Sequence, residues 1–167
     1  MTIPSALAEK ITTKVAECIK TASLYFKQSF PAPKVSYALR GKAAGKAYFT
    51  LNEIRLNPIL LQENEEAFIN EVVPHEIAHL LTVRLYGKVR PHGSEWQGIM
   101  QNVFSLPAST THSFSIASVQ GKAFEYQCAC QSHPLSIRRH NRVQRQQTLY
   151  SCRKCGQQLT FTGQRLS

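Results

Sequence analysis

The stretch that most restricts what this chain can be runs from Val72 to Leu81 and reads VVPHEIAHLL. Side chains four positions apart project from one face of an α-helix. His75 and His79 would therefore lie one turn apart and offer two imidazoles to a single metal ion. Glu76 lies beside them, where its carboxylate can take a proton from an attacking water without being a ligand. This spacing of two histidines and a carboxylate is typical of the zinc-binding helix of metalloproteases.

The same stretch also fits an amphipathic core helix, because its other side chains are mostly apolar. That alternative would bury a carboxylate and two imidazoles, which is costly unless each has a polar partner. A zinc ion supplies such a partner. We therefore interpret His75 and His79 as metal ligands and Glu76 as the catalytic base.

A catalytic zinc needs a third protein ligand and one open position. His92 follows His79 by thirteen residues, and its neighbours Pro91 and Gly93 restrict its backbone. Glu95 is the rival ligand, because two histidines and a glutamate hold zinc equally well. We prefer His92, in which case Glu95 becomes a residue that orients the ligands.

The residues around this motif predict an α+β fold. Residues 5–29 carry apolar side chains at helical spacing, whereas residues 34–57 alternate as three short antiparallel strands would. Residues 64–86 form the active-site helix, with a kink or a break at Pro74. We predict a minimal zincin-like metalloprotease domain made of a long helix, a three-stranded antiparallel sheet and the active-site helix. The last strand, residues 54–57, would edge the cleft and hold an extended peptide by strand addition.

The segment after this domain has the composition of a linker. Residues 107–122 are rich in Ser, Thr, Ala and Gln, with one short strand expected at residues 113–116. We expect His112 to be a surface residue rather than a ligand. The predicted domains are a metalloprotease domain at residues 1–118 and a smaller domain at residues 119–167.

Two cysteine pairs near the C-terminus predict a zinc ribbon. They are Cys128-x-Cys130 and, 22 residues later, Cys152-x-x-Cys155-Gly. A unit of this size has too small a core to fold alone, and a structural metal would supply the missing stability. The first pair is one residue shorter than usual, so His133 is an alternative to Cys130 as the fourth ligand. We prefer Cys130.

The charge of the chain suggests a polyanionic partner. Lys and Arg number 20 against 10 acidic residues, a formal net charge of +10, which favours nucleic acid first and acidic lipid second. Arginine forks suit phosphates, and Tyr126, Tyr150 and Phe124 would stack on bases, so we expect single-stranded DNA to be preferred. A solvated basic hairpin is the alternative. The densest basic cluster lies between the cysteine pairs and consists of Arg138, Arg139, Arg142 and Arg145.

The sequence has no run of 18 apolar residues and no basic region followed by an apolar core at its N-terminus. Cysteines at metal-like spacing suit a reducing compartment better than a disulfide scaffold does. We therefore expect a monomeric cytoplasmic protein without membrane contacts.

Together these motifs resemble the SprT family of zinc metalloproteases, whose eukaryotic relatives are the Spartan DNA–protein crosslink proteases. The resemblance covers nearly the whole chain and implies a zinc site of His75, His79 and His92 with Glu76 as the base. It also implies protein substrates that are bound or crosslinked to DNA, and proteolysis that DNA binding switches on. The matching segments are VVPHEIAHL at 72–80, PHGSEW at 91–96, YQC at 126–128, RHNR at 139–142 and YSCRKCG at 150–156.

Two functional hypotheses follow. The first is a zinc peptidase that cleaves protein substrates with two zinc ions, one catalytic and one structural. The second is a nucleic-acid-binding regulator with a vestigial metal site. The intact Glu76 favours the peptidase, because a binding protein needs no base beside its metal. No convincing oxyanion donor emerges, since the candidates Tyr48, Tyr86 and Arg90 are weak.

Overall fold

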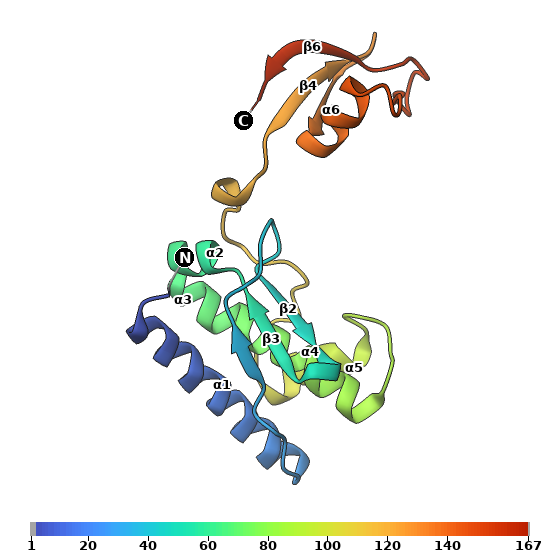
Figure 1. Ribbon diagram of the computed structural model, residues 1–167. Coiled ribbons are helices and arrows are strands. Elements are labelled where there is room, and N and C mark those ends of the chain that lie inside the picture. The colour runs from blue at the N-terminus through green and yellow to red at the C-terminus, as the bar shows by residue number, and fades with distance from the viewer. Residues whose placement is uncertain (1–2, 167) are drawn as a thin grey trace. The chain divides into compact units, whose positions relative to one another are not determined.

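The computed structural model describes residues 3–166 and divides the chain into two units, residues 1–119 and 120–167 (Figure 1). Each unit has its own apolar core. The fold is α+β, as predicted, with one small sheet in each unit. None of the helices in the described part of the chain is both long and apolar enough to cross a membrane.

The sheet of the first unit is mixed rather than antiparallel. Its strands are β1 (Lys34–Ser36), β2 (Gly45–Tyr48) and β3 (Glu53–Leu56), in the order β1-β3-β2. The prediction is correct for β2, which runs antiparallel to β3, but wrong for β1, which runs parallel to it. The connection between β1 and β2 crosses from one side of β3 to the other, so β2 pairs with the edge of β3 that β1 leaves free. Alternating side chains do not reveal strand direction, so the sequence pattern could not show this.

The central position of β3 corrects a second expectation. Residues 54–57 do not edge the cleft, because β3 is hydrogen-bonded on both sides and Ile54 and Leu56 are fully buried. The edge strands of the sheet are β1 and β2, and β2 packs against α4 (Val73–Tyr86) (Figure 1).

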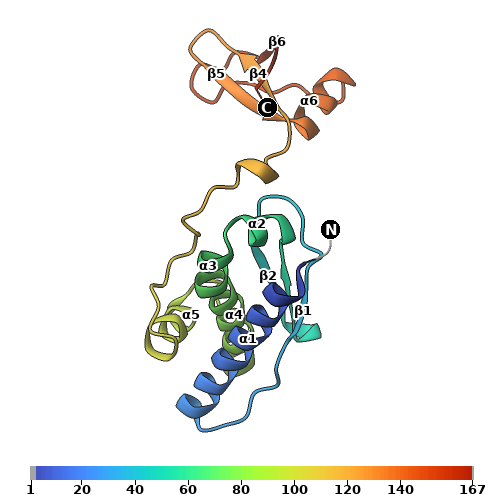
Figure 2. The same ribbon diagram turned by 90° about the vertical axis from the view of Figure 1, so that its left-hand side faces the viewer.

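The helices of this unit follow their apolar periodicity. Helix α1 (Ser5–Phe26) buries one face against α4 (Val73–Tyr86), and the two helices lie side by side (Figure 2). The short helices α2 (Pro58–Glu63), α3 (Glu65–Ala67) and α5 (Ser94–Gly98) complete the layer. Two single turns are 3₁₀-helical, η1 (Phe49–Leu51) and η4 (Ala117–Val119). Two others are π-helical, η2 (Phe68–Val72) and η3 (Ile99–Val103).

The chain was predicted to kink or break at Pro74, and the helix changes there from π-helical to α-helical hydrogen bonding. The π-helical turn η2 ends at Val72, and α4 begins at Val73 with Pro74 in its first turn. Pro74 has no N–H to donate to the preceding turn, so the regular ladder cannot run through it. His75 therefore lies in the first turn of α4.

Residues 106–116, which we call the strap, form part of the first unit rather than a free linker. At one end the Leu106 N–H donates to the Met100 carbonyl at 2.9 Å. Beyond the other end the Ser118 hydroxyl donates to the Glu63 carboxylate at 2.5 Å. The expected strand at residues 113–116 is not formed. The strap instead bends at residues 110–111 and 113–114, and its alternate residues His112, Phe114 and Ile116 are half-buried.

The second unit is a three-stranded antiparallel sheet with one helix. Its elements are β4 (Ala123–Gln127), β5 (Ser132–Ser136), α6 (Ile137–Gln144) and β6 (Thr160–Arg165), with the strand order β5-β4-β6. His140 attaches α6 to the sheet by stacking on Phe124 at 3.8 Å and sharing a 3.1 Å hydrogen bond with the Tyr126 hydroxyl. Tyr126 is fully buried, so the expectation that it stacks on bases is wrong.

Candidate metal centres

Three histidines converge in the first unit. His75 and His79 project from α4, and His92 comes from the loop before α5. Their three Nε2 atoms form a triangle with every side 3.1 Å long. Tetrahedral zinc with Zn–N bonds of about 2.0–2.1 Å needs N···N separations of about 3.3–3.4 Å. The three imidazoles thus fit one zinc ion with a fourth position open.

The backbone at His92 is unusual. Its φ of 57° lies in the left-handed region, where residues other than glycine are uncommon. The turn is closed by the Gly93 N–H, which donates to the Arg90 carbonyl at 3.0 Å. This conformation brings His92 back to the two histidines of α4.

The ring of Trp96 packs against all three histidine rings. It is fully buried, and its ring centroid lies 4.7 Å from His75, 5.5 Å from His79 and 4.7 Å from His92. Its indole N–H also donates to the His75 carbonyl at 3.4 Å. The buried Trp96 ring, which does not line the cavity over His75 and Glu76, therefore restricts the positions of the three imidazoles.

Burial keeps these histidines neutral. It lowers the pKa of His75 to about 4 and that of His79 to about 3, and it also lowers the pKa of His92. A neutral imidazole offers a lone pair, which is the form that binds metal. The backbone carbonyl of Ser109, in the strap, accepts a hydrogen bond from His75. Since Nε2 of His75 faces the other histidines, this contact fixes the opposite nitrogen and the orientation of the ring.

Glu76 is buried beside this cluster. It is 6% exposed, and burial raises its pKa to about 8, while the backbone N–H of Ala47 in β2 acts in the opposite direction. The strand approaches very closely here, because a Cβ on Gly45 would lie 2.6 Å from the Glu76 Cγ. Only glycine leaves room for the carboxylate under β2.

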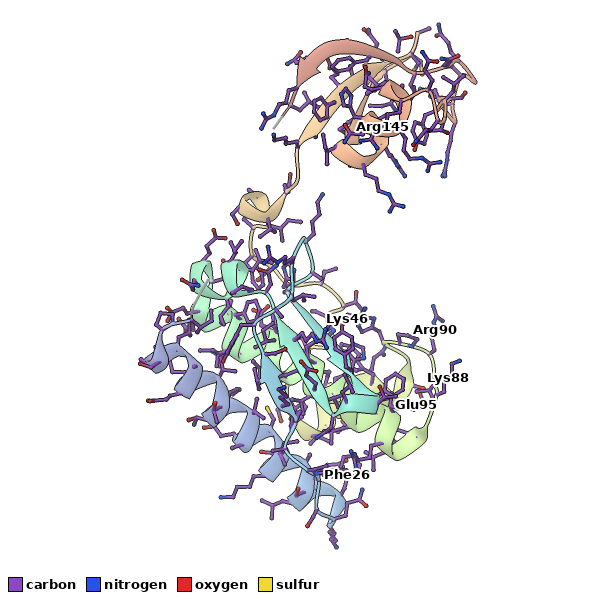
Figure 3. The ribbon with its side chains drawn as sticks, viewed as in Figure 1. Phe26, Lys46, Lys88, Arg90, Glu95 and Arg145 are labelled. Carbon is purple, nitrogen blue, oxygen red and sulfur yellow. The ribbon has the colours of Figure 1, made fainter. Side chains whose placement is uncertain are left out.

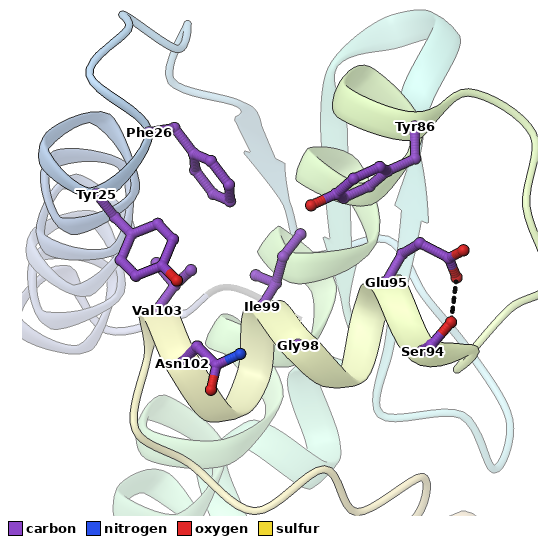
Figure 4. Close-up of a pocket in the computed structure, with 9 residues that line it drawn as sticks. All are labelled: Tyr25, Phe26, Tyr86, Ser94, Glu95, Gly98, Ile99, Asn102 and Val103. Carbon is purple, nitrogen blue, oxygen red and sulfur yellow. Dashed lines mark hydrogen bonds between the residues drawn. The ribbon is translucent and has the colours of Figure 1, made fainter.

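Glu95, the rival third ligand, faces another part of the surface. Its carboxylate accepts from the Ser94 hydroxyl at 3.1 Å and lines a pocket of about 290 Å³ with Tyr25 and Tyr86 (Figure 4). It does not belong to the group of ligand atoms that His75, His79 and His92 form within the described residues. Its hydrogen bond goes to Ser94 rather than to any of the three histidines, so its expected orienting role has no support.

A cavity of about 860 Å³ opens over His75 and Glu76. Its lining includes the start of β2 with Gly45 and much of the strap. His112, expected to be a surface residue, is half-buried and lines this cavity. Its half-buried position follows from the docking of the strap on the first unit, and His112 lies outside the group of ligand atoms that His75, His79 and His92 form. An inward position in the alternation of residues 112–116 was the signal in the sequence.

The second unit gathers its four cysteines. Sγ of Cys130 lies 3.4 Å from that of Cys128 and 3.7 Å from that of Cys152, and Cys155 completes the group. Tetrahedral zinc with Zn–S bonds of about 2.3 Å needs S···S separations of about 3.7–3.8 Å. His133 lies beside the group, with its Nε2 3.4 Å from the Cys128 Sγ. The cluster therefore already contains four thiol ligands without it.

The turn around the second cysteine pair is shaped for a thiolate. The Lys154 N–H donates to the Cys152 Sγ at 3.4 Å, and the backbone N–H groups of Cys155 and Lys154 lower the pKa of Cys152. Gly156 closes the turn with a φ of 74°, where a side chain would be strained. These features explain the glycine in the Cys-x-x-Cys-Gly motif.

The four arginines lie on and just after α6. All are exposed, and none forms an ion pair with any residue in the described part of the chain. The guanidinium of Arg139 lies 5.6 Å from the centre of the Tyr150 ring, and Arg145 follows the end of α6 (Figure 3). Residues 120–167 hold eight Lys or Arg against one Glu, so +7 of the formal net charge of +10 belongs to this unit.

Comparison with known proteins defines the class to which this fold and its two clusters belong. The SprT-like family matches residues 15–112, and the SprT-like zinc ribbon domain matches residues 122–163. The chain therefore belongs to the SprT-like family, as the resemblance in the sequence implied.

Similar proteins cover nearly the whole chain. A relative named Protein SprT from Vibrio parahaemolyticus is 57% identical over 96% of this chain and 98% of its own length. Those from Vibrio atlanticus and Yersinia pestis, also named Protein SprT, are 59% and 50% identical over 95% of this chain, covering 95% and 94% of their own lengths. No solved structure matches the chain.

The contact of Gly45 with Glu76 yields a first prediction. Gly45→Ala should destabilise the fold by about 1–3 kcal/mol, because the new methyl group overpacks against a buried side chain. Combining it with Glu76→Ala should recover most of that loss, so the double variant will be more stable than the two single changes predict. Urea unfolding of the four proteins measures this coupling.

The matched control is Gly98→Ala in α5, where the nearest atom to a new Cβ is 3.8 Å away. It should leave stability unchanged or raise it by up to about 1 kcal/mol. Strictly additive losses for Gly45→Ala and Glu76→Ala would show that the two residues do not compete for the same space.

Proposed function

We propose that this chain is a zinc-dependent metalloendopeptidase that cleaves protein substrates associated with or crosslinked to DNA. The observation that carries the proposal is the triangle of three Nε2 atoms, 3.1 Å apart, beside a buried Glu76 at the base of a large cleft. In this proposal His75, His79 and His92 hold the catalytic zinc. When bound, zinc would polarise the scissile carbonyl and lower the pKa of water.

Glu76 is the general base in this mechanism. Its carboxylate takes a proton from the attacking water and later gives it to the leaving amine. A buried carboxylate with a raised pKa accepts and returns a proton more readily than a solvated one near neutral pH. The Ala47 N–H and the close approach of Gly45 hold this carboxylate in place.

The free edge of β2 supports binding of an extended peptide. The Ala44 carbonyl accepts from the Asn57 N–H at 2.8 Å, so by the alternation of an antiparallel ladder Gly45 and Ala47 turn their main-chain groups away from β3. The Ala47 N–H reaches Glu76, which agrees with this direction. We propose that the Gly45 N–H and the carbonyls of Gly45 and Ala47 pair with the substrate backbone, which places the peptide along the cleft.

The second unit would recruit the substrate through DNA. A zinc ion on Cys128, Cys130, Cys152 and Cys155 would stabilise its small core. The arginine surface next to it is basic and free of ion pairs within the described residues, which supports phosphate binding. Of the aromatic residues expected to stack on bases, Tyr150 is half-buried and pairs with Arg139, so it is the candidate that favours single strands. Reduced thiols in both pairs suit a cytoplasmic location.

The alternative is a nucleic-acid-binding regulator with a vestigial site. The basic second unit favours it, but the first unit does not. A vestigial site has no reason to keep a buried carboxylate that requires glycine in the neighbouring strand.

Replacing the base separates these two functions. Glu76→Gln should keep the fold and both zinc ions but lower cleavage of a loosely folded protein by about 10²–10⁴-fold, because an amide cannot accept the proton. Gel-based cleavage rates, with and without single-stranded DNA, check this. Undiminished cleavage by the variant would exclude Glu76 as the base.

Metal analysis tests the two sites. We expect about two zinc ions per chain, and about one after His92→Ala. Glu95→Ala is the matched control and should keep both ions. Mild chelation should remove the histidine-bound zinc first, while loss of the second zinc should unfold residues beyond 120, as hydrogen exchange would detect. A wild-type chain with a single zinc would contradict this assignment.

A salt titration tests the arginine surface. Changing Arg138, Arg139 and Arg142 together to Gln should flatten the slope of log affinity against log salt by about two to three units, since each lost phosphate contact contributes about 0.7–0.9. Fluorescence anisotropy with single-stranded DNA measures the slope. The control variant replaces Lys20, Lys34 and Lys88, all exposed in the first unit, with Gln. It removes the same charge and should leave the slope unchanged. Equal slopes for the wild type and the arginine variant would place the DNA surface elsewhere.

A further inference from the structure

His112 occupies a position where the strap otherwise places apolar side chains. Along residues 111–116 the side chains alternate between exposed and half-buried, and the inward ones are His112, Phe114 and Ile116. Phe114 and Ile116 pack against the core of the first unit. The third inward residue, His112, has a polar ring that contributes little to that packing, so its inward position requires another explanation.

The hydrogen bonding of His112 is incomplete. Its Nδ1 is the one buried side-chain nitrogen or oxygen without a hydrogen-bond partner among residues 3–166. A buried bare nitrogen costs less than a buried N–H without an acceptor, so the proton of the neutral ring belongs on Nε2. Nε2 is not buried and has no partner among these residues either. The ring therefore presents a free N–H donor.

This donor lies in the cleft of the candidate site. His112 lines the same cavity as His75 and Glu76, and the two histidine rings are close enough to interact electrostatically. The strap and the start of β2 both line this cavity, so an extended peptide in the cleft would contact both.

The three residues that the sequence suggested as oxyanion donors do not reach the cavity. Tyr86 lines the separate pocket with Glu95 (Figure 4), and Arg90 projects from the loop before α5 (Figure 3). The Tyr48 ring is covered by Arg55, whose guanidinium lies 4.2 Å from its centre. None of these three residues lines the cavity over His75 and Glu76.

We propose that His112 is a further catalytic residue, whose Nε2–H donates a hydrogen bond to the carbonyl oxygen of the scissile peptide. This inference rests on the proposed peptidase function and adds to it the missing oxyanion donor. As the water oxygen bonds to the carbonyl carbon, its proton goes to Glu76 and negative charge develops on the carbonyl oxygen. Breaking the C–N bond then returns the carbonyl, and Glu76 gives its proton to the leaving amine. The hydrogen bond from His112 is strongest while the charge is present.

The ring is held rigidly for this task. It stacks on Phe114 with centroids 3.9 Å apart and planes 5° from parallel. Phe114 in turn stacks on the fully buried Phe68 at 5.8 Å. A donor fixed before the substrate arrives needs no reorganisation when charge develops, which is the condition for strong stabilisation.

Two variants of the full-length, zinc-loaded chain separate catalysis from packing. His112→Phe keeps the stack on Phe114 but removes the donor, so kcat should fall by about 10²–10³-fold with KM changed by less than about threefold. His112→Gln loses the stack but keeps an N–H donor, and it should recover at least about tenfold of that loss. A purely structural role for His112 predicts the opposite order, with Phe more active than Gln.

Inhibitor binding gives a readout that does not depend on turnover. A phosphinic peptide carries a tetrahedral group at the position of the reacting carbon, and its affinity should fall for His112→Phe in parallel with kcat/KM. The affinity of the matching amide peptide, measured on a Glu76→Gln background, should stay within about threefold. Zinc content should remain that of the wild type.

The outcomes distinguish the two proposals. Wild-type rates in both variants, or a Phe variant as active as the Gln variant, would overturn the role of His112 while leaving the peptidase function intact. A wild-type chain that neither cleaves protein nor binds the phosphinic peptide would contradict both.

Discussion

The first unit depends on the burial of a carboxylate that has no cationic side chain to pair with. Glu76 is 6% exposed, and no ion pair in the described residues includes it. Its surroundings compensate only in part, through the Ala47 N–H and the space that Gly45 leaves. The three imidazoles next to it are kept neutral by the same burial. A divalent cation bound by the three neutral imidazoles would offset the cost of burying the carboxylate beside them.

The two clusters lie on cores of different size. The core of the first unit extends from α1 to the strap, so we expect this unit to fold without an ion. The core of the second unit is small, and two of its five buried residues, Cys128 and Cys152, are themselves candidate ligands. We therefore expect metal binding by the second unit to be coupled to its folding. In the proposed function the histidine site would hold an exchangeable, catalytic ion and the cysteine site a structural one.

Helical spacing, caps and cysteine spacing allowed much of this arrangement to be predicted. His75 and His79 had to face one way, and Pro74 had to begin a helix, because both follow from local geometry. Strand direction did not follow, since the alternation of β1 is the same in parallel and antiparallel pairing. The strap was missed because its Ser- and Thr-rich composition resembles that of a linker, whereas its docking depends on distant partners such as Glu63. Burial of Tyr126 likewise required the partner His140, which no local pattern reveals.

The strap and helix α4 share one point of attachment. Phe68 belongs to the π-helical turn that leads directly into α4, and Phe114 of the strap stacks on it. The strap then reaches His75 through the Ser109 carbonyl and lines the cleft with His112. A change that loosens the contact of Phe68 with Phe114 would therefore disturb the start of α4, the orientation of the His75 ring and the part of the cleft that the strap lines. The segment that looks least structured in the sequence thus completes the site, because its few apolar side chains are anchored where α4 begins.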